Sequence, residues 1–228
     1  MYHFPMTTMT RSRLAACLLA LALPAAGCGA GPNAGAPGLQ PAADLGPAVI
    51  REYQGKKLTD FERLRDNSIS GPVAVDTLRY RLTVDGLVRR KLSLTYRQAL
   101  GFPQYQKLIT LYCVEGWDAT GLWRGLLVAD LLDSAGVKPA ANTLIFHAAD
   151  GEYTTSLPLQ TVLQRRMLLC HRINNAPLSA KTGFPFMLAA EDRLGYKWIK
   201  WVDRIEVSAD STYLGFWEKR GYDNKADR

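Results

Sequence analysis

Residues Thr110-Leu-Tyr-Cys-Val-Glu-Gly-Trp117 place one cysteine where a strand is expected to end. The stretch leading to it, Leu108–Tyr112, has an alternating character that predicts a strand. Gly116 follows and indicates a loop. Cys113 can therefore present its thiolate to a pocket as a nucleophile, a redox-active thiol or a soft-metal ligand. The alternative is a buried structural cysteine, because free cysteines are among the most buried residues.

Strands and short helices are expected on both sides of this stretch. Runs at 80–84 and 88–94 flank Asp85-Gly86, which predicts a β-hairpin. Thr95-Tyr-Arg-Gln98 fits a capping box for a short helix that ends near Phe102-Pro103. Apolar residues over 127–135 form one helical face, and Gly136 suits the end of that helix.

The second half of the chain continues the same mixture. Leu144–Phe146 predicts a strand that ends before Asp150-Gly151. Ser156 is expected to cap a helix with Pro158 in its first turn, and 198–207 is expected to end as a strand. Because strands and helices intermix without strict βαβ order, we predict a single α+β domain built on a mixed sheet.

The N-terminus has the features of an export signal. Arg11 and Arg13 precede a short apolar run, and the small residues of 25–27 lead to Cys28. We therefore predict a signal peptide with a lipobox at 1–28, a flexible Gly-, Ala- and Pro-rich tether at 29–50 and the folded domain at 51–228. Lipidated Cys28 would hold the domain at a membrane face. Cleavage without a lipid is the alternative, because the usual Leu of the lipobox is Ala25.

Charge and composition exclude some functions. The chain has 28 basic and 21 acidic residues and a net charge of +7. The basic residues are scattered and form no block with interleaved aromatic residues, so nucleic acid is not an expected partner. Only Cys113 and Cys170 fall in the folded part, where an oxidising compartment would allow them to pair. We expect His147 and His171 to be structural.

Four motifs, taken in order, point to one family. They are Cys113-Val-Glu-Gly-Trp117, Trp123-Arg-Gly125, Gly183-Phe-Pro185 and Gly195-Tyr-Lys-Trp-Ile-Lys-Trp201. Over about residues 80–223 this order resembles that of the sulfite oxidase-type molybdopterin oxidoreductases. The resemblance implies the sulfite oxidase-type fold, a molybdenum–molybdopterin cofactor and oxygen-atom transfer.

The resemblance also assigns residues to the cofactor. It implies that Cys113 is the catalytic thiolate and the molybdenum ligand, and that the cofactor is contacted by Asn67, Thr182, Trp198, Ile199 and Lys200. Lysine suits a phosphate because it acts as a point charge. The alternative for 198–201 is a basic strand that faces water, with both tryptophans in the core.

Three positions depart from the family pattern. Thr182 stands where the family has Asn, Met187 where it has Arg, and Ala148 where it has Thr. Met187 cannot bind a phosphate, so we consider Arg193 or Lys197 as replacements for its charge. Trp217 and Tyr222 are expected to close the surface by packing the C-terminal tail over the edge of the domain.

The resulting hypothesis is an exported, membrane-tethered oxidoreductase on the periplasmic or another extracytoplasmic face. Its substrate would be a small sulfite- or sulfoxide-like molecule, and the direction of transfer stays open. No Cys-x-x-Cys-His haem motif occurs, so electrons would pass to a separate partner. Arg11-Ser-Arg13 lacks the adjacent arginines of the export signal that folded molybdopterin proteins use. The alternative function is a cofactor-free binding or interaction lipoprotein on the same scaffold.

Overall fold

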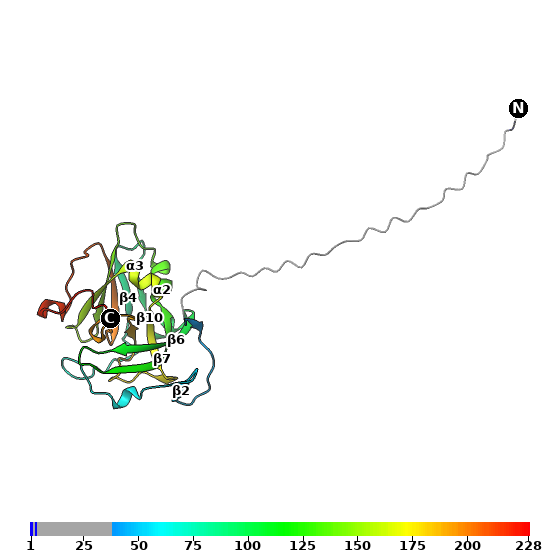
Figure 1. The fold of residues 1–228 in the computed structure, drawn as a ribbon. Coiled ribbons are helices and arrows are strands. Elements are labelled where there is room, and N and C mark those ends of the chain that lie inside the picture. Colours follow the sequence, from blue (N-terminus) through cyan, green and yellow to red (C-terminus); the bar gives the residue numbers. More distant parts are fainter. Residues whose placement is uncertain (2, 4–37) are drawn as a thin grey trace. The chain divides into compact units, whose positions relative to one another are not determined.

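A long β-hairpin carries Cys113. In the computed structural model, which describes Met1, His3 and residues 38–228, β6 (Gln104–Tyr112) pairs antiparallel with β7 (Asp118–Leu127) over nine residues from Gln104↔Leu126 to Tyr112↔Asp118 (Figure 1). Buried and less buried residues alternate over the second half of β6, as expected for a strand with one face on a core. The strand predicted before Cys113 is therefore confirmed.

The hairpin belongs to a six-stranded antiparallel sheet. β7 pairs with β10 (Leu168–Ile173), and β10 pairs with both β11 (Ala176–Pro177) and β12 (Met187–Ala189). On the other side, β6 pairs with the short β1 (Gln40–Pro41). These pairings bring Met187 opposite Cys170 in the middle of the sheet.

A second sheet has five strands and is mixed. Its order is β5 (Leu92–Leu94), β4 (Leu82–Gly86), β13 (Val202–Ser208), β8 (Thr143–Ala148) and β9 (Thr154–Pro158). Only the β13–β4 pair is parallel. The predicted hairpin is present as β4–β5, but its turn is not at Asp85-Gly86: these residues end β4 and pair with β13, and residues 87–91 connect the two strands. The predicted α+β fold on a mixed sheet is confirmed as a whole.

The helices are short, and two of them follow the sequence signals. α1 (Tyr96–Leu100) begins with the predicted capping box, in which Thr95 Oγ1 accepts from Gln98 N at 3.2 Å and Gln98 Oε1 accepts from Thr95 N at 2.9 Å. α2 (Val128–Ala135) ends at Gly136, whose φ of 71° is left-handed. α2 contacts β4 and β7, one strand of each sheet, and so helps to close the core between them.

One of the two elements predicted here was wrong. Ser156 does not cap a helix: it lies within β9 opposite Ile145, and α3 (Leu159–Gln164) begins after Pro158. The strand expected at the end of 198–207 is confirmed as β13, which begins at Val202, and the 3₁₀ turn η2 (Gly195–Lys197) precedes 198–201. Tertiary pairing decided the case of Ser156, which a local capping signal could not anticipate.

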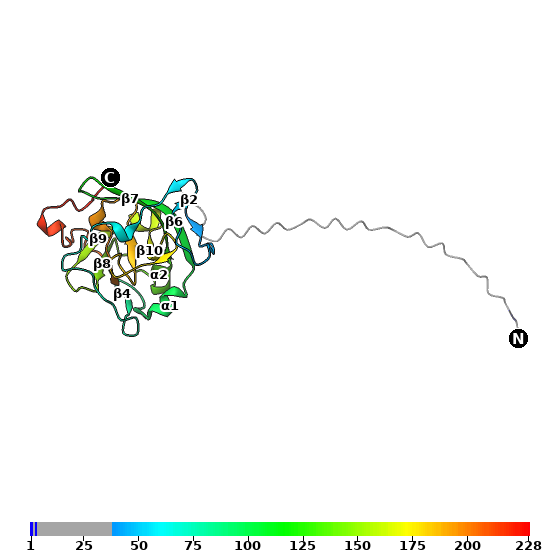
Figure 2. The same ribbon diagram turned by 90° about the horizontal axis from the view of Figure 1, so that it is seen from below.

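The segment before residue 82 wraps around the domain. It contains the short pair β2 (Glu52–Tyr53) and β3 (Lys56–Lys57) and the 3₁₀ turn η1 (Phe61–Arg63) (Figure 2). Part of the predicted tether also makes contacts: besides β1, Asn175 Nδ2 donates to the carbonyls of Gly46 and Ala48. The folded part thus begins near residue 40 rather than at 51. The predicted signal peptide, Cys28 and residues 29–37 lie outside the described residues.

Trp123 lies at the centre of the core. Its side chain is fully buried, and its Nε1 donates to the carbonyl of Ile109 at 3.1 Å. The ring is 5.1 Å from that of Phe61 and 4.9 Å from that of Trp198. Trp123 therefore joins the N-terminal arm to the segment after η2. Within residues 38–228 no helix has the length and apolar character needed to cross a membrane.

Candidate active site

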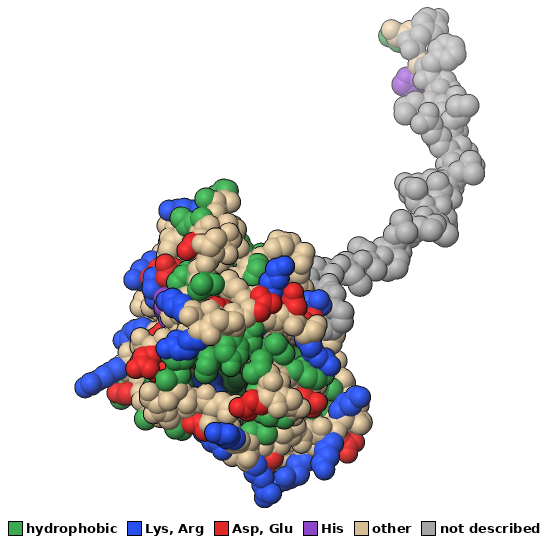
Figure 3. Space-filling model, turned by 60° about the vertical axis from the view of Figure 1, so that its left-hand side comes forward, with side chains coloured by type: hydrophobic (Ala, Val, Ile, Leu, Met, Phe, Trp, Pro, Cys, Tyr) green, Lys and Arg blue, Asp and Glu red, His purple; other side chains and the backbone are tan. Residues whose placement is uncertain are grey.

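Five segments of the chain supply most of the lining of a cavity of about 590 Å³. They are the arm 61–69, the turn 113–117 between β6 and β7, the loop 181–187, the segment 195–201, and the C-terminal segment at 216–222. Figure 3 brings forward the side on which the red C-terminal turn η3 (Glu218–Arg220) lies in Figure 1, and shows a hollow lined by hydrophobic side chains with charged side chains around it. The volume lies within the range of ligand pockets, about 300–1,000 Å³.

All the residues that the sequence assigns to a site line this one cavity. They are Asn67, Cys113, Thr182, Trp198, Ile199 and Lys200. These residues come from four segments that are far apart in the chain, so only the fold brings them together.

Cys113 is positioned by the hairpin turn. Its N–H donates to Trp117 O at 2.9 Å, and its carbonyl accepts from Gly116 N at 3.2 Å. The other flank is Gly195, where an added Cβ would lie 3.7 Å from Cys113 Cα. The start of η2 therefore lies beside the cysteine.

The thiol of Cys113 is free and partly exposed. Its Sγ lies 4.0 Å from Glu115 Oε2, which also accepts from Trp117 Nε1 at 3.1 Å. Burial raises the pKa of Cys113, so the thiol carries its proton at neutral pH in this environment. Cys170 is also free and lies in the core, where burial raises its pKa well above the usual range. The described cysteines therefore form no disulfide.

Lys200 reaches the cavity and pairs with the N-terminal arm. Its Nζ lies 3.1 Å from Asp66 Oδ1, and Asp66 also accepts from the Ser68 hydroxyl at 2.5 Å. Burial alone would raise the pKa of Asp66, but the hydrogen bonds from Ser68 and Lys200 outweigh it and lower the pKa. An anion bound at Lys200 would therefore compete with the Asp66 carboxylate.

The remaining predicted residues shape the wall rather than offer free donors. Thr182 Oγ1 accepts from Ser179 N at 2.8 Å and so stabilises its own loop. Trp198 Nε1 donates to Arg193 O at 3.0 Å, and Ile199 is buried with its carbonyl bonded to Leu188 N. The alternative of a basic strand facing water is wrong in its first part, because 198–201 line the cavity and are not strand. Its second part is confirmed, because Trp198 and Trp201 are both buried.

The two residues considered as replacements for the charge missing at Met187 do not serve that purpose. Lys197 is fully buried and pairs with Glu218, and Arg193 pairs with Asp227. Neither lines the cavity, whereas Met187 does and presents an apolar side chain there. Ala148 lies in β8 and is also not among the lining residues, so that departure changes nothing in the cavity itself.

Sequence reasoning missed two groups of lining residues. One is cationic and comprises Arg65 and Lys181, whose Nζ donates to Glu62 O at 2.6 Å beside η1. The other is aromatic and comprises Tyr153, Tyr196, Phe216, Trp217 and Tyr222, with Arg220 beside them. The aromatic residues of the tail were expected only to close the surface, and no local pattern indicates that they face the same cavity as Cys113.

The residues present fit a molybdenum–molybdopterin cofactor. Cys113 supplies the soft sulfur ligand that such a metal prefers. Lys200, Lys181 and Arg65 supply positive charge for a phosphate on the same cavity. Met187 supplies no positive charge, so the charge available to a phosphate comes from the two lysines and the arginine of other segments.

Comparison with known proteins also points to a molybdopterin cofactor. The family model described as the oxidoreductase molybdopterin binding domain matches residues 70–217. The uncharacterized oxidoreductase YuiH of Bacillus subtilis is 33% identical over 170 residues, covering 74% of this chain and 84% of its own. The putative protein-methionine-sulfoxide reductase subunit YedZ1 of Azospira oryzae is 34% identical over 148 residues, covering 65% and 56%.

A solved structure agrees on the fold. The sulfane dehydrogenase SoxCD from Paracoccus pantotrophus has a TM-score of 0.61 at 21% identity, with 77% of this chain and 51% of that chain covered. The chain thus spans about half the length of SoxCD and of YedZ1. With most of the domain matched by the family model, the chain belongs to the oxidoreductase molybdopterin binding domain family and is an oxidoreductase with a molybdenum–molybdopterin cofactor.

Proposed function

We propose that this protein transfers an oxygen atom to or from a small sulfite- or sulfoxide-like substrate, with Cys113 as the protein ligand of molybdenum. The observation that carries the proposal is the single cavity that gathers Cys113 with Lys200, Thr182, Asn67 and the segment 198–199. The cofactor, when bound, supplies the oxygen-atom and electron transfer. The protein supplies the ligand, the orientation and the exclusion of water.

Each residue has a distinct role in this proposal. Cys113 holds the metal from the turn of the β6–β7 hairpin, where backbone hydrogen bonds fix its position. Lys200, which pairs with Asp66 in this structure, would hold the phosphate of the pterin. Trp198 packs on Trp123 and Ile199 is buried in the core, so both would give the cofactor a rigid surface.

We further propose that the enzyme acts outside the cytoplasm and is anchored through a lipid on Cys28. The apolar N-terminal run followed by Ala25-Ala-Gly-Cys28 supports the anchor. A separate electron-transfer partner is expected, and the similarity to a protein whose name describes it as a reductase subunit is consistent with such an assembly.

The test is the molybdenum and pterin content per chain of protein purified from its native host. The proposal predicts about one molybdenum and one pterin per chain, together with reduction or oxidation of small sulfur compounds. A heterologous host is a poor substitute, because loading can fail there for unrelated reasons. A native protein without pterin would contradict the proposal and would favour the cofactor-free binding lipoprotein.

A further inference from the structure

The C-terminal segment 213–224 contributes aromatic rings to the lining of the cavity. Its Phe216, Trp217 and Tyr222 line the cavity together with Tyr153 and Tyr196. The ring centroids are 5.7 Å apart for Tyr153–Phe216, 5.3 Å for Phe216–Trp217, 5.0 Å for Trp217–Tyr222 and 5.2 Å for Tyr222–Tyr196. The five rings therefore make one continuous surface, which we call the aromatic wall.

The aromatic wall lies close to Cys113. Tyr196 follows Gly195, whose backbone packs against Cys113, and Leu194 forms a β-bridge with Tyr112. Tyr196, at one end of the wall, is therefore the next residue in the chain after Gly195, which lies beside the proposed metal ligand Cys113. A substrate that reaches Cys113 through this cavity meets these rings.

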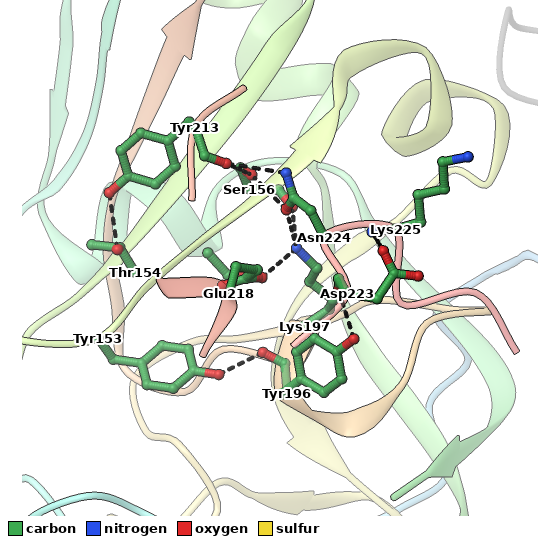
Figure 4. A network of polar contacts seen from close by, with 11 residues as sticks. Tyr153, Thr154, Ser156, Tyr196, Lys197, Tyr213, Glu218, Asp223, Asn224 and Lys225 are labelled. Carbon is green, nitrogen blue, oxygen red and sulfur yellow. Dashed lines mark hydrogen bonds and ion pairs between the residues drawn. The ribbon is translucent and has the colours of Figure 1, made fainter. Parts of the chain in front are cut away.

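A buried ion pair fixes the wall in place. Figure 4 shows Lys197 at the centre of the network, pairing with Glu218 and donating to Asn224 Oδ1 at 2.9 Å and to Ser156 O at 3.0 Å. The side chains of Lys197 and Glu218 are 0% and 1% exposed. Lys197 follows Tyr196 directly, and Glu218 follows Trp217, so the pair joins the two halves of the wall.

The backbone of the tail is also pressed onto β9. Phe216 N donates to Thr154 O at 2.9 Å, and an added Cβ at Gly215 would lie 2.3 Å from that same carbonyl oxygen. Asn224 Nδ2 donates to Tyr213 O at 3.1 Å and closes the segment on itself. The wall is therefore a built part of the domain and not a loose tail.

Two of the hydroxyls of the wall are already used in hydrogen bonds. Tyr153 and Tyr196 donate their hydroxyls to the carbonyls of Tyr196 and Asp223. The Arg220 guanidinium stacks 3.5 Å from the Phe216 ring, and its Nη1 donates to Phe216 O at 2.7 Å. The rings offer a ligand their faces and edges, which attract apolar groups and sulfur.

We propose that the aromatic wall binds the apolar substituent of an uncharged organic sulfoxide or thioether, and that Trp217 and Tyr222 determine this specificity. The inference rests on the proposed function and narrows its substrate from sulfite- or sulfoxide-like compounds to the organic class. A sulfite ion gains little from the rings themselves, because the rings carry no positive charge and the ion has no apolar substituent for them to bind.

The experiment compares methyl phenyl sulfoxide, dimethyl sulfoxide and sulfite as substrates of the molybdenum-loaded full chain. For Trp217→Ala and Tyr222→Ala we expect kcat/KM for methyl phenyl sulfoxide to fall by roughly 3- to 10-fold, mainly through KM, because each variant loses one aromatic contact. The value for dimethyl sulfoxide should change by less than about 2-fold, because that molecule has no aromatic group to lose. Leu214→Ala is the matched control, since Leu214 is exposed on the same segment and does not line the cavity.

A second measurement does not depend on turnover. The dissociation constant of methyl phenyl sulfoxide, obtained by saturation-transfer NMR titration of the chain as purified, should rise in both variants and stay unchanged in Leu214→Ala. Equal losses for both sulfoxides, unchanged binding in the variants, or a wild-type preference for sulfite would overturn the inference. A wild-type chain that binds the aryl sulfoxide selectively but contains no molybdenum would support this inference and contradict only the proposed function.

Discussion

At the scale of single residues, Lys200 and Asp66 decide how the cavity treats an anion. The two side chains are 23% and 24% exposed, so the pair is neither fully solvated nor sealed in the core. Without a bound anion, the carboxylate of Asp66 neutralises the positive charge of Lys200. A phosphate at Lys200 would have to replace this carboxylate.

The first prediction concerns that exchange. Lys200→Met should weaken retention of the pterin by on the order of tenfold, because a charge-assisted hydrogen bond contributes about 1.5–3 kcal/mol. Asp66→Asn should leave retention equal or higher, since it removes the competing carboxylate. Pterin and molybdenum per chain measure both effects, with circular dichroism as the control for folding. Equal cofactor content in wild type and Lys200→Met would place the phosphate elsewhere, with Lys181 and Arg65 as the next candidates.

At the scale of elements, the turn η2 and the C-terminal segment depend on one buried pair. The second prediction is that Lys197→Met lowers the free energy of unfolding by about 3–5 kcal/mol, because Glu218 is left as an uncompensated buried charge. The double variant with Glu218→Gln should recover part of this loss. Urea unfolding of the purified chain measures all three proteins.

An exposed pair provides the control for that prediction. Arg63 and Asp60 form an ion pair 3.4 Å long with side chains that are 88% and 42% exposed. Arg63→Met should therefore cost at most about 1 kcal/mol. If Lys197→Met costs no more than Arg63→Met, the pair does not hold the C-terminal segment in place.

Local signals predicted the elements well wherever capping or turn chemistry is decisive. Thr95 and Gln98 determine the start of α1, and Gly136 determines the end of α2. Asp85-Gly86 predicted a hairpin that exists, but at the wrong turn, because both residues are taken into β4 and pair with β13. The prediction that Ser156 caps a helix failed because Ser156 lies in the buried strand β9, where its hydroxyl donates to Tyr213 O. That bond crosses 57 residues of chain, and no local pattern reports it.

The candidate site was likewise predicted only in part from the sequence. Cys113 could be identified from the end of its own strand, and family resemblance added Lys200, Thr182 and Asn67 from distant segments. The aromatic wall could not be anticipated, because its position depends on how residues 213–224 fold back over β9. Similarly, Lys197 is a plausible phosphate ligand in the sequence, and only its burial against Glu218 removes it.

At the scale of the whole molecule, the third prediction concerns stability and pH. Burial, with Arg124 and Arg172 nearby, lowers the pKa of His171 to about 4, and its Nε2 lies 2.9 Å from Gln104 Oε1. The unfolded chain takes up a proton on this residue below about pH 6.5, whereas the folded chain does so only near pH 4. Folding stability should therefore fall as the pH drops from 6.5 towards 4, by up to about 3 kcal/mol.

The variant His171→Gln should reduce this dependence. Its free energy of unfolding in urea should change less between pH 7.5 and pH 5 than that of wild type, while the effect of the substitution at pH 7.5 reflects the changed packing and the changed hydrogen bond to Gln104. The same slope with pH in both proteins would show that other groups cause the acid sensitivity.

The fourth prediction concerns the attachment of the molecule to a membrane. If Cys28 carries a lipid, the native protein should sediment with membranes, and Cys28→Ala should release it or block its processing. The lipid chains provide the affinity, because two or more anchor a protein far more firmly than one. A native protein found entirely in the soluble fraction with an unmodified N-terminus would contradict this prediction.

The central claim is that Cys113 ligates molybdenum at the turn of the β6–β7 hairpin. Cys113→Ser should abolish turnover with little change in fold, because a hard hydroxyl replaces a soft thiolate. The most direct measurement is X-ray absorption at the molybdenum edge of the loaded wild type and of this variant. The account predicts one sulfur neighbour fewer around molybdenum in Cys113→Ser, and an unchanged number of sulfur neighbours would contradict it.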